Sequence, residues 1–264
     1  MDPLAPLIDN LHGEGRLRVW SLVITVFGDS VQNRGGLIST ARLGRLLGRV
    51  GVEPGAIRTA LSRLARDGWV VGERSGRVSE YRLTPDGLLR FIGATERIYA
   101  APQAGPIRDW TLSLEDGGAE GFALGPLWLR PAGAPQPRAA FRMEGRLTAL
   151  TAAVRDSLVA PAHRAGLDRL QADLDALSGA DLGPLDSCAA RTLLIHRWRR
   201  IALRFPDLPA ELLPADVIPP RAAVARAYAR LTPAAEAWLD SAAPDMPALR
   251  ASDASLALRF TKPS

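Results

Sequence analysis

The sequence predicts an α+β protein that is mainly helical. Apolar residues recur at the three- and four-residue spacing of helices in segments near both ends of the chain. After Gly68 that spacing gives way to the alternation of strands. The chain has 264 residues, more than the roughly 150 of a usual domain, so we expect more than one domain.

The composition predicts a cytoplasmic protein without a cofactor. Hydrophobic residues make up 47% of the chain, and its longest strongly apolar stretch, 22–27, is far shorter than the ~18 residues that span a bilayer. The first residues have no basic region ahead of a long apolar run, so we expect no secretory signal. The single cysteine cannot form an internal disulfide, and His12, His163 and His196 are not spaced as zinc ligands are. Without a phosphate-binding loop or a nucleophile motif, no catalytic residue and no metal are predicted.

Three helices are predicted in the N-terminal part. The first spans 15–27 and ends at Gly28-Asp29, the second begins at Thr40 as a possible N-cap, and the third begins near Glu53 with Pro54 in its first turn. Gly51 and Gly68 end the second and third helices. The inward-facing residues are Leu17, Trp20, Val23, Ile24 and Phe27 in the first helix, Leu43, Leu46 and Leu47 in the second, and Ile57, Ala60, Leu61 and Leu64 in the third.

A β-hairpin is predicted to follow the third helix. Residues 69–71 form a short strand, 78–83 form a second strand with alternating character, and 74–77 form the tip with an arginine on each side of the turn. Thr84 then caps another helix, with Pro85 in the first turn and Asp86 near the positive end of the helix dipole. Three helices followed by a two-stranded hairpin are typical of a winged helix-turn-helix.

Positive charge is concentrated in this segment. Residues 34–82 hold ten arginines against four acids, a net charge of +6, whereas the whole chain carries +5. A local basic surface is expected of a protein that binds a phosphate backbone, and arginine can also bind guanine through two hydrogen bonds. The alternative is a solvated face whose arginines serve only solubility. The predicted DNA-binding residues are Thr40, Arg42, Arg58, Thr59, Ser62, Arg63, Arg66, Arg74 and Arg77.

Four stretches resemble the PaaX family, transcriptional repressors of phenylacetic acid degradation. They are SLVITVFGD at 21–29, with Arg34-Gly35-Gly36 shortly after it, IRTALSRLARDGW at 57–69, SGRVSEYRLTPDG at 75–87, and LLIHRWRRIALRFPDLPAELLP at 193–214. The resemblance implies a non-enzymatic homodimer that binds an inverted-repeat operator in double-stranded DNA. It also implies release by an aryl-acetyl-CoA thioester such as phenylacetyl-CoA. A different acyl-CoA, or no effector, is the alternative.

The resemblance further implies three domains. A winged helix-turn-helix at 1–95 is followed by a reduced ferredoxin-like, Cas2-like domain at 96–146 and a helical effector and dimerisation domain at 147–264. Remnants of the middle domain are residues 97–99, strands at 110–115 and 125–130, and an edge strand at 141–144, with 131–137 as an interdomain linker. A Cas2-like nuclease is the less favoured hypothesis, because its available acids, Asp109, Glu115, Asp116 and Glu120, surround a shortened element.

The C-terminal part is predicted to be helical at 162–178, 185–205 and 221–240, with an extended or mobile tail after Ser241. In the second of these helices Arg197, Arg200 and Arg204 form a basic stripe beside His196. The resemblance implies that this stripe binds the phosphates of an acyl-CoA effector. Trp198 is a candidate for stacking on a ring of that effector. The alternatives are ion pairs with acids such as Glu211 or Asp216, and a core position for Trp198.

Overall fold

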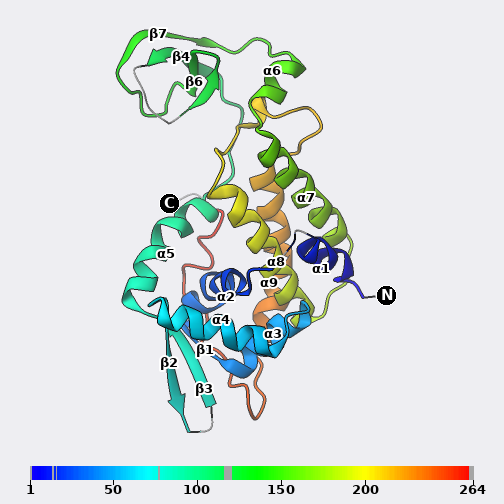
Figure 1. The fold of residues 1–264 in the computed structure, drawn as a ribbon. Coiled ribbons are helices and arrows are strands. Elements are labelled where there is room, and N and C mark those ends of the chain that lie inside the picture. The colour runs from blue at the N-terminus through cyan, green and yellow to red at the C-terminus, as the bar shows by residue number, and fades with distance from the viewer. Residues whose placement is uncertain (1, 14, 16, 77, 116–120, 262–264) are drawn as a thin grey trace.

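A computed structural model describes residues 2–13, 15, 17–76, 78–115 and 121–261 as an α+β fold with two small antiparallel sheets (Figure 1). In chain order the elements are α1 (Ala5–His12), α2 (Val19–Val26), the π-helical turn η1 (Phe27–Val31), the 3₁₀ turn η2 (Gln32–Arg34), β1 (Leu37–Ser39), α3 (Thr40–Arg49), α4 (Pro54–Arg66), β2 (Val70–Ser75), β3 (Val78–Leu83), α5 (Pro85–Ile98), β4 (Asp109–Glu115), β5 (Phe122–Leu124), β6 (Leu127–Pro131), β7 (Ala139–Arg146), α6 (Ala152–Ser157), α7 (Pro161–Leu177), α8 (Pro184–Ala202), η3 (Ala210–Leu212) and α9 (Pro220–Asp240). No helix of this described part is long and apolar enough to cross a membrane.

The head of the molecule consists of α2 to α5 and the sheet β1-β3-β2. The predicted third helix and hairpin strand are present as α4 and β3, and β2 and β3 pair from Val70 opposite Leu83 to Ser75 opposite Val78. Thr84 caps α5 as predicted, accepting a hydrogen bond from the backbone N–H of Gly87 at 3.0 Å. The three-residue strand β1, which pairs with β3, was not predicted because it is too short to show alternation.

Two predicted helix ends in the head are wrong. Ser39, not Thr40, is the N-cap of α3, since its hydroxyl accepts from the backbone N–H of Arg42 at 3.2 Å. The first helix also does not stop at Gly28: it widens into η1 and η2 and ends at Gly35, whose φ of +83° suits glycine. A Cβ on Gly28 would lie 2.0 Å from the Phe91 ring, so this glycine permits α5 to approach closely.

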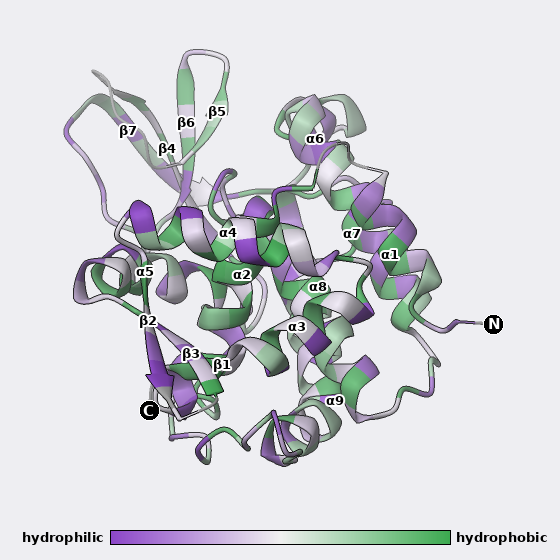
Figure 2. Ribbon diagram, turned by 60° about the horizontal axis from the view of Figure 1, so that its bottom comes forward, coloured by the Kyte–Doolittle hydropathy of each residue, from purple (hydrophilic) through white to green (hydrophobic). Residues whose placement is uncertain are grey.

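The helical body consists of α1, α7, α8 and α9, and α8 is its central element. Every residue of α8 from Ser187 to Trp198 is buried, because α8 packs against α1, α7 and α9 within the body and against α2, α3 and α5 of the head. In Figure 2 the hydrophobic ribbon of α2 lies behind α4, and the element contacts place α2 against both α4 and α8. The head therefore rests directly on the buried helix of the body.

The strands β4 to β7 form an appendage at the end of the molecule opposite the β2–β3 hairpin (Figure 1). Their antiparallel order is β5-β6-β4-β7, and among the described residues between α5 and α6 no helix accompanies them. The ferredoxin-like prediction is therefore not confirmed, although strands occur near 110–115 and 125–130 and β7 is an edge strand. Residues 97–99 belong to the end of α5 in the head, so they are not a remnant of the middle domain. Residues 131–137 connect β6 to β7 within one sheet, so their predicted role as an interdomain linker is also wrong.

The tail, residues 241–261, is irregular but docked on the head and the body. The backbone N–H of Asp253 donates to the carbonyl of Asn33 at 2.7 Å, and that of Phe260 donates to the carbonyl of Tyr99 at 2.8 Å. The Phe260 ring lies 5.4 Å from the Tyr99 ring and 5.5 Å from the Tyr228 ring, between centroids. The prediction of an extended or mobile tail is therefore corrected: the tail is irregular and docked, because Met246 and Phe260 are buried.

Phe260→Ala should lower the free energy of unfolding by about 3 kcal/mol, the lower end of the range for a buried phenylalanine. The side chain is 9% exposed and joins the two tyrosines, so its loss leaves a cavity between the tail, the head and the body. Leu258→Ala is the matched control, since Leu258 is 59% exposed and should change stability by no more than about 0.5 kcal/mol. Urea unfolding of both variants measures this; equal, small effects would contradict a docked tail.

Candidate nucleic-acid interface

The outer face of α4 presents the polar residues that the sequence pattern predicted. Ile57, Ala60, Leu61 and Leu64 are buried beneath it. Arg58, Thr59, Ser62, Arg63 and Arg66 are all exposed on the opposite side. The i, i+3 and i+4 periodicity of one amphipathic helix accounts for both faces.

The arginines of this face have only weak internal partners. Arg63 lies 3.5 Å from a carboxylate oxygen of Asp67 and 5.8 Å from the Trp20 ring, and Arg66 lies 3.7 Å from Asp67. The side chains of Arg63 and Arg66 are 57% and 77% exposed. Exposed pairs of this kind contribute about 0–1 kcal/mol, so a phosphate or a guanine can replace them.

The β2–β3 hairpin extends beyond α4 and carries further positive charge (Figure 1). Arg74 is exposed near its tip, and its Nε donates to the carbonyl of Gly76 at 3.3 Å; Arg77 lies outside the described residues. Thr40 is half-buried and donates its hydroxyl to the carbonyl of Ser79 at 3.0 Å, which connects α3 to β3. Arg45 is exposed on α3, opposite Leu43, Leu46 and Leu47, and is an additional candidate that the predicted set left out although the helical spacing could have found it.

Arg42 does not belong to this surface, so the prediction that it contacts DNA is wrong. Its side chain is fully buried and donates to the carbonyl oxygens of Trp238, at 2.8 Å, and of Ser241 and Pro247. It also lies 4.9 Å from the Trp238 ring centroid. Arg42 therefore joins α3 to the end of α9, and part of the charge counted in 34–82 is internal.

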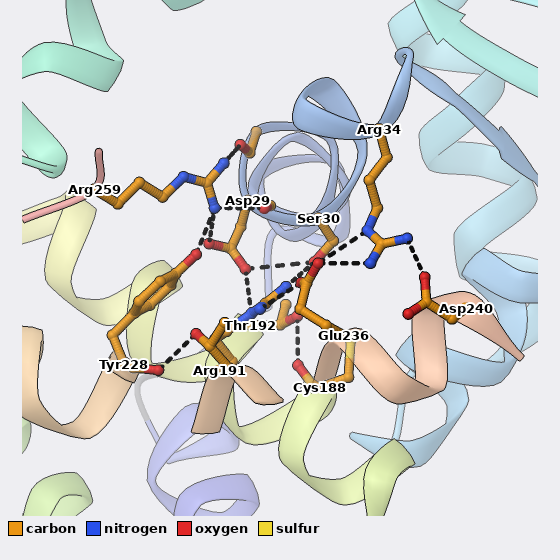
Figure 3. Close-up of polar contacts among 12 residues, drawn as sticks. Asp29, Ser30, Arg34, Cys188, Arg191, Thr192, Tyr228, Glu236, Asp240 and Arg259 are labelled. Atoms are coloured by element: carbon orange, nitrogen blue, oxygen red, sulfur yellow. Dashed lines mark hydrogen bonds and ion pairs between the residues drawn. The ribbon is translucent and has the colours of Figure 1, made fainter. Parts of the chain in front are cut away.

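A second internal arginine from that segment, Arg34, leads to a buried charge network (Figure 3). Asp29, on η1 and 0% exposed, accepts from Arg191 Nε of α8 at 3.0 Å and from Arg259 of the tail at 3.1 Å. Arg191 also donates to Glu236 of α9 at 2.7 Å, and Glu236 accepts from Arg34 at 2.6 Å. Head, body and tail thus meet in one charge network.

The network is electrically balanced. Arg34 also pairs with Asp240 at 2.7 Å, so the three cations Arg34, Arg191 and Arg259 face three anions. The Tyr99 hydroxyl donates to Asp29 Oδ1 at 2.8 Å. Burial would raise the pKa of the Asp29 carboxyl, but Arg191, Arg259 and the Tyr99 hydrogen bond outweigh it and hold that pKa below its usual 3.8. Asp29 is therefore an anion throughout the neutral range.

Cys188, which lies beside this network in Figure 3, is not a reactive thiol. It is fully buried, and burial raises its pKa to about 12. A thiol with this pKa is protonated at neutral pH, so Cys188 serves as a small core residue.

The predicted effector stripe on α8 is only partly at the surface. His196 is buried with its Nδ1 2.9 Å from Thr25 Oγ1, Arg197 is buried in an ion pair with Asp173, and Trp198 is buried and donates to the carbonyl of Ile98 at 2.8 Å. The prediction that these three contact an effector is therefore wrong, because the head and α7 cover them. Arg200 and Arg204 are exposed, and only these two stay candidates.

The space beside the buried members of the stripe is small. The pocket lined by His196, Arg197 and Arg200 has a volume of about 10 Å³, and so has the one beside Trp198. Such a volume holds about one water molecule. Within the described residues no group of three or more His, Cys, Asp and Glu side chains is arranged for a metal ion, and Asp116 and Glu120 of the nuclease hypothesis lie outside them.

Comparison with known proteins matches two separate segments of the chain. A model of the PaaX-like protein family matches residues 18–87, and a model of the PaaX-like protein C-terminal domain matches residues 158–241. The chain is 30% identical to the transcriptional repressor PaaX of Escherichia coli K12 over 259 residues, 83% of this chain and 82% of that protein. This chain belongs to the PaaX family.

Both matched segments of the PaaX-family chain contribute to the charge network. Asp29 and Arg34 lie in the first segment, and Arg191, Glu236 and Asp240 lie in the second. The relative is named as a repressor and not as an enzyme, in agreement with the regulatory role predicted here. The uncharacterized protein Rv0674 of Mycobacterium tuberculosis is a further match in structure, with 20% identity, a TM-score of 0.44, and coverage of 74% of this chain and 88% of that one.

Asp29→Asn should lower the free energy of unfolding at pH 7 by about 3–5 kcal/mol, because it leaves Arg191 and Arg259 buried without their shared anion. Since the native pKa of Asp29 is depressed, its contribution is present above the unfolded pKa of about 3.8. It is lost as the pH falls below that value and through the native pKa. Urea unfolding from pH 7 to pH 3 should therefore show less loss of stability in the variant than in the wild type. If the free energy of unfolding fell equally with pH in the variant and the wild type, Asp29 would not be a buried anion that stabilises the fold.

Proposed function

We propose that the chain is a DNA-binding transcriptional repressor in which α3, α4 and the β2–β3 hairpin act as a winged helix-turn-helix. The observation that carries the proposal is the exposed face of α4, which presents both Arg58 and Arg63. A helix of this width fits the major groove, where an arginine discriminates guanine by about 1–3 kcal/mol. The named function of the Escherichia coli relative supports the same conclusion.

The hairpin supplies the second contact. Arg74 at its tip, with Arg77, would bind phosphate or enter the minor groove, and Arg45 on α3 would bind the backbone beside α4. Contacts of this kind contribute affinity that is independent of sequence and falls with salt. Two copies of the chain would place their α4 helices in successive major grooves, ~34 Å apart, on an inverted repeat. The proposed assembly is therefore a homodimer on double-stranded DNA.

Arg58→Ala and Arg63→Ala should each weaken binding to the operator by ~1–3 kcal/mol, because each removes one base-reading or phosphate contact. The operator is a duplex that the protein itself selects from a random pool, and fluorescence anisotropy measures the affinity. Arg169→Ala, a change of an exposed arginine on α7, is the matched control and should bind like the wild type. Unchanged affinity in both α4 variants would remove this helix from the recognition role.

The proposed signal is an acyl-CoA thioester, with phenylacetyl-CoA as the first candidate and another acyl-CoA, or none, as the alternative. Arg200 and Arg204, exposed at the end of α8, are the groups that would bind its phosphates. These arginines lie on the body, whereas the DNA contacts lie on the head, so the effector would not touch the operator. Release would follow because the effector binds one arrangement of head and body more tightly and the operator binds the other.

Phenylacetyl-CoA should release the wild-type protein from its operator, and Arg200→Glu should abolish release while operator affinity without the thioester stays unchanged. The reason is that a carboxylate at position 200 repels phosphate but lies outside the DNA interface. Operator titrations with and without the thioester measure both quantities, with Arg169→Glu as the control for a reversed surface charge. Normal release of the Arg200→Glu protein would place the phosphates elsewhere.

A further inference from the structure

A pocket lies where the head meets the body. It has a volume of about 190 Å³ and is bounded by α2 and α5 of the head and by α8 and the residue after its end. Its walls are largely apolar and include Ile24, Phe91, Ala94, Ile98, Ile195 and Leu203. Apolar pockets between structural units, with few polar groups, are the usual binding sites for small molecules.

Arg199, a charged group of this pocket, has no counter-ion among the residues that the structure describes. Arg199 of α8 is half-buried, and Nη1 donates to the carbonyl of Ser21 at 3.2 Å and to Thr25 Oγ1 at 3.0 Å, both neutral acceptors. Within the described part of the chain no carboxylate lies within ion-pair distance of Arg199, whereas Arg191 and Arg197 of the same helix each have one. Burial lowers the pKa of the Arg199 guanidinium, as expected of a cation that has lost water without gaining an anion.

The other ionisable groups that line the pocket do not compensate Arg199. The Asp29 carboxylate is bound by Arg191 and Arg259, and Tyr99 donates to that same carboxylate. Arg90 is exposed at the rim, 5.2 Å from the Trp69 ring centroid, and adds a second positive charge. The pocket therefore combines an apolar body with a positive potential.

We propose that this pocket binds a small carboxylic acid with an apolar body, whose carboxylate pairs with Arg199. The apolar body displaces water from the walls formed by Ile24, Phe91 and Ile195, and the carboxylate supplies Arg199 with an anion that the described residues do not. The groups that Arg199 already binds orient its guanidinium, so little side-chain freedom is lost on binding. This binding does not depend on DNA.

The position of the pocket gives the ligand a route to the head. Phe91 of α5 lines the pocket and also packs against Gly28 of η1, so a ligand beside the ring changes how α5 rests on the head. Asp29, the next residue, belongs to the charge network. An effect of the ligand on operator affinity would follow from these contacts; that consequence rests on the proposed DNA-binding function.

Ligand-observed NMR titration of the full chain, without DNA, tests the site. Hexanoate serves as the probe, hexanamide as its neutral isostere, acetate as an anion without an apolar body, and hexanoyl-CoA as the thioester source of the same body. Hexanoate should bind roughly tenfold or more tightly than either hexanamide or acetate. Hexanamide lacks the charge-assisted hydrogen bond to Arg199, and acetate lacks the apolar body. Binding of the thioester alone would contradict the proposal, as would equal binding of hexanoate and hexanamide or failure of every probe to bind.

Substitutions at Arg199 and at an exposed arginine outside the pocket provide the matched variants. Arg199→Met should weaken hexanoate binding roughly tenfold and Arg199→Lys less, whereas Arg169→Met, a change of an exposed arginine on α7, should leave it unchanged. Ala94→Phe fills the pocket from α5 and should abolish binding even if Arg199→Met fails to fold. Unchanged binding in Ala94→Phe, or a loss of binding in Arg169→Met but not in Arg199→Met, would overturn the site. Operator affinity of the same variants without ligand is measured separately, so failure here leaves the DNA-binding proposal intact.

Discussion

The architecture depends on a buried anion, Asp29, that three parts of the chain share. It lies on η1 of the head, and its partners Arg191 and Arg259 come from the body and the tail. A buried carboxylate without cations would lose several kcal/mol of hydration, and breaking such a pair typically destabilises a protein by about 3–5 kcal/mol. The head is therefore held in a defined position on α8 only when Arg191 of the body and Arg259 of the tail are both in place around Asp29. Arg42 provides a second connection, from α3 to the carbonyl groups that follow α9.

This arrangement gives a physical basis for coupling between a ligand and DNA. The exposed face of α4 is on one side of the head, and α2 lies between α4 and α8. The pocket at Arg199 lies between α2 and α5 of the head and α8 of the body, beside Phe91 and Asp29 of the charge network. A small change in the distance between α5 and α8 would thus reach α4 through packed side chains. Packed interfaces of this kind tend to adopt discrete arrangements, which is what a switch between bound and released states requires.

Local signals allowed much of the head to be predicted. The alternation and turn residues of 69–83 defined the hairpin, and Pro54 and Thr84 marked helix starts, because these signals act over a few residues. Long-range packing could not be read in the same way. Gly28-Asp29 has the composition of a helix end, yet Gly28 admits Phe91 and Asp29 binds arginines about 160 and 230 residues away in sequence, so the helix continues. Likewise Arg197 was predicted to bind effector phosphates as part of a basic stripe, although packing of the head and α7 around α8 buries it. The sequence signal that could have indicated this burial is a charged residue next to or within an apolar segment, as Asp29 is after 22–27.

Native-state hydrogen exchange tests the central claim, that head, body and tail form one cooperative unit through Asp29. The amides to compare are those of α4, of α8, and of Asp253 and Phe260, whose N–H groups bind the carbonyls of Asn33 and Tyr99. In the wild type the best-protected amides of all three parts should exchange through the same global opening, with equal free energy and equal dependence on denaturant. In Asp29→Asn the three parts should separate, with the tail opening first. Independent opening of the tail or the head in the wild type would contradict the account.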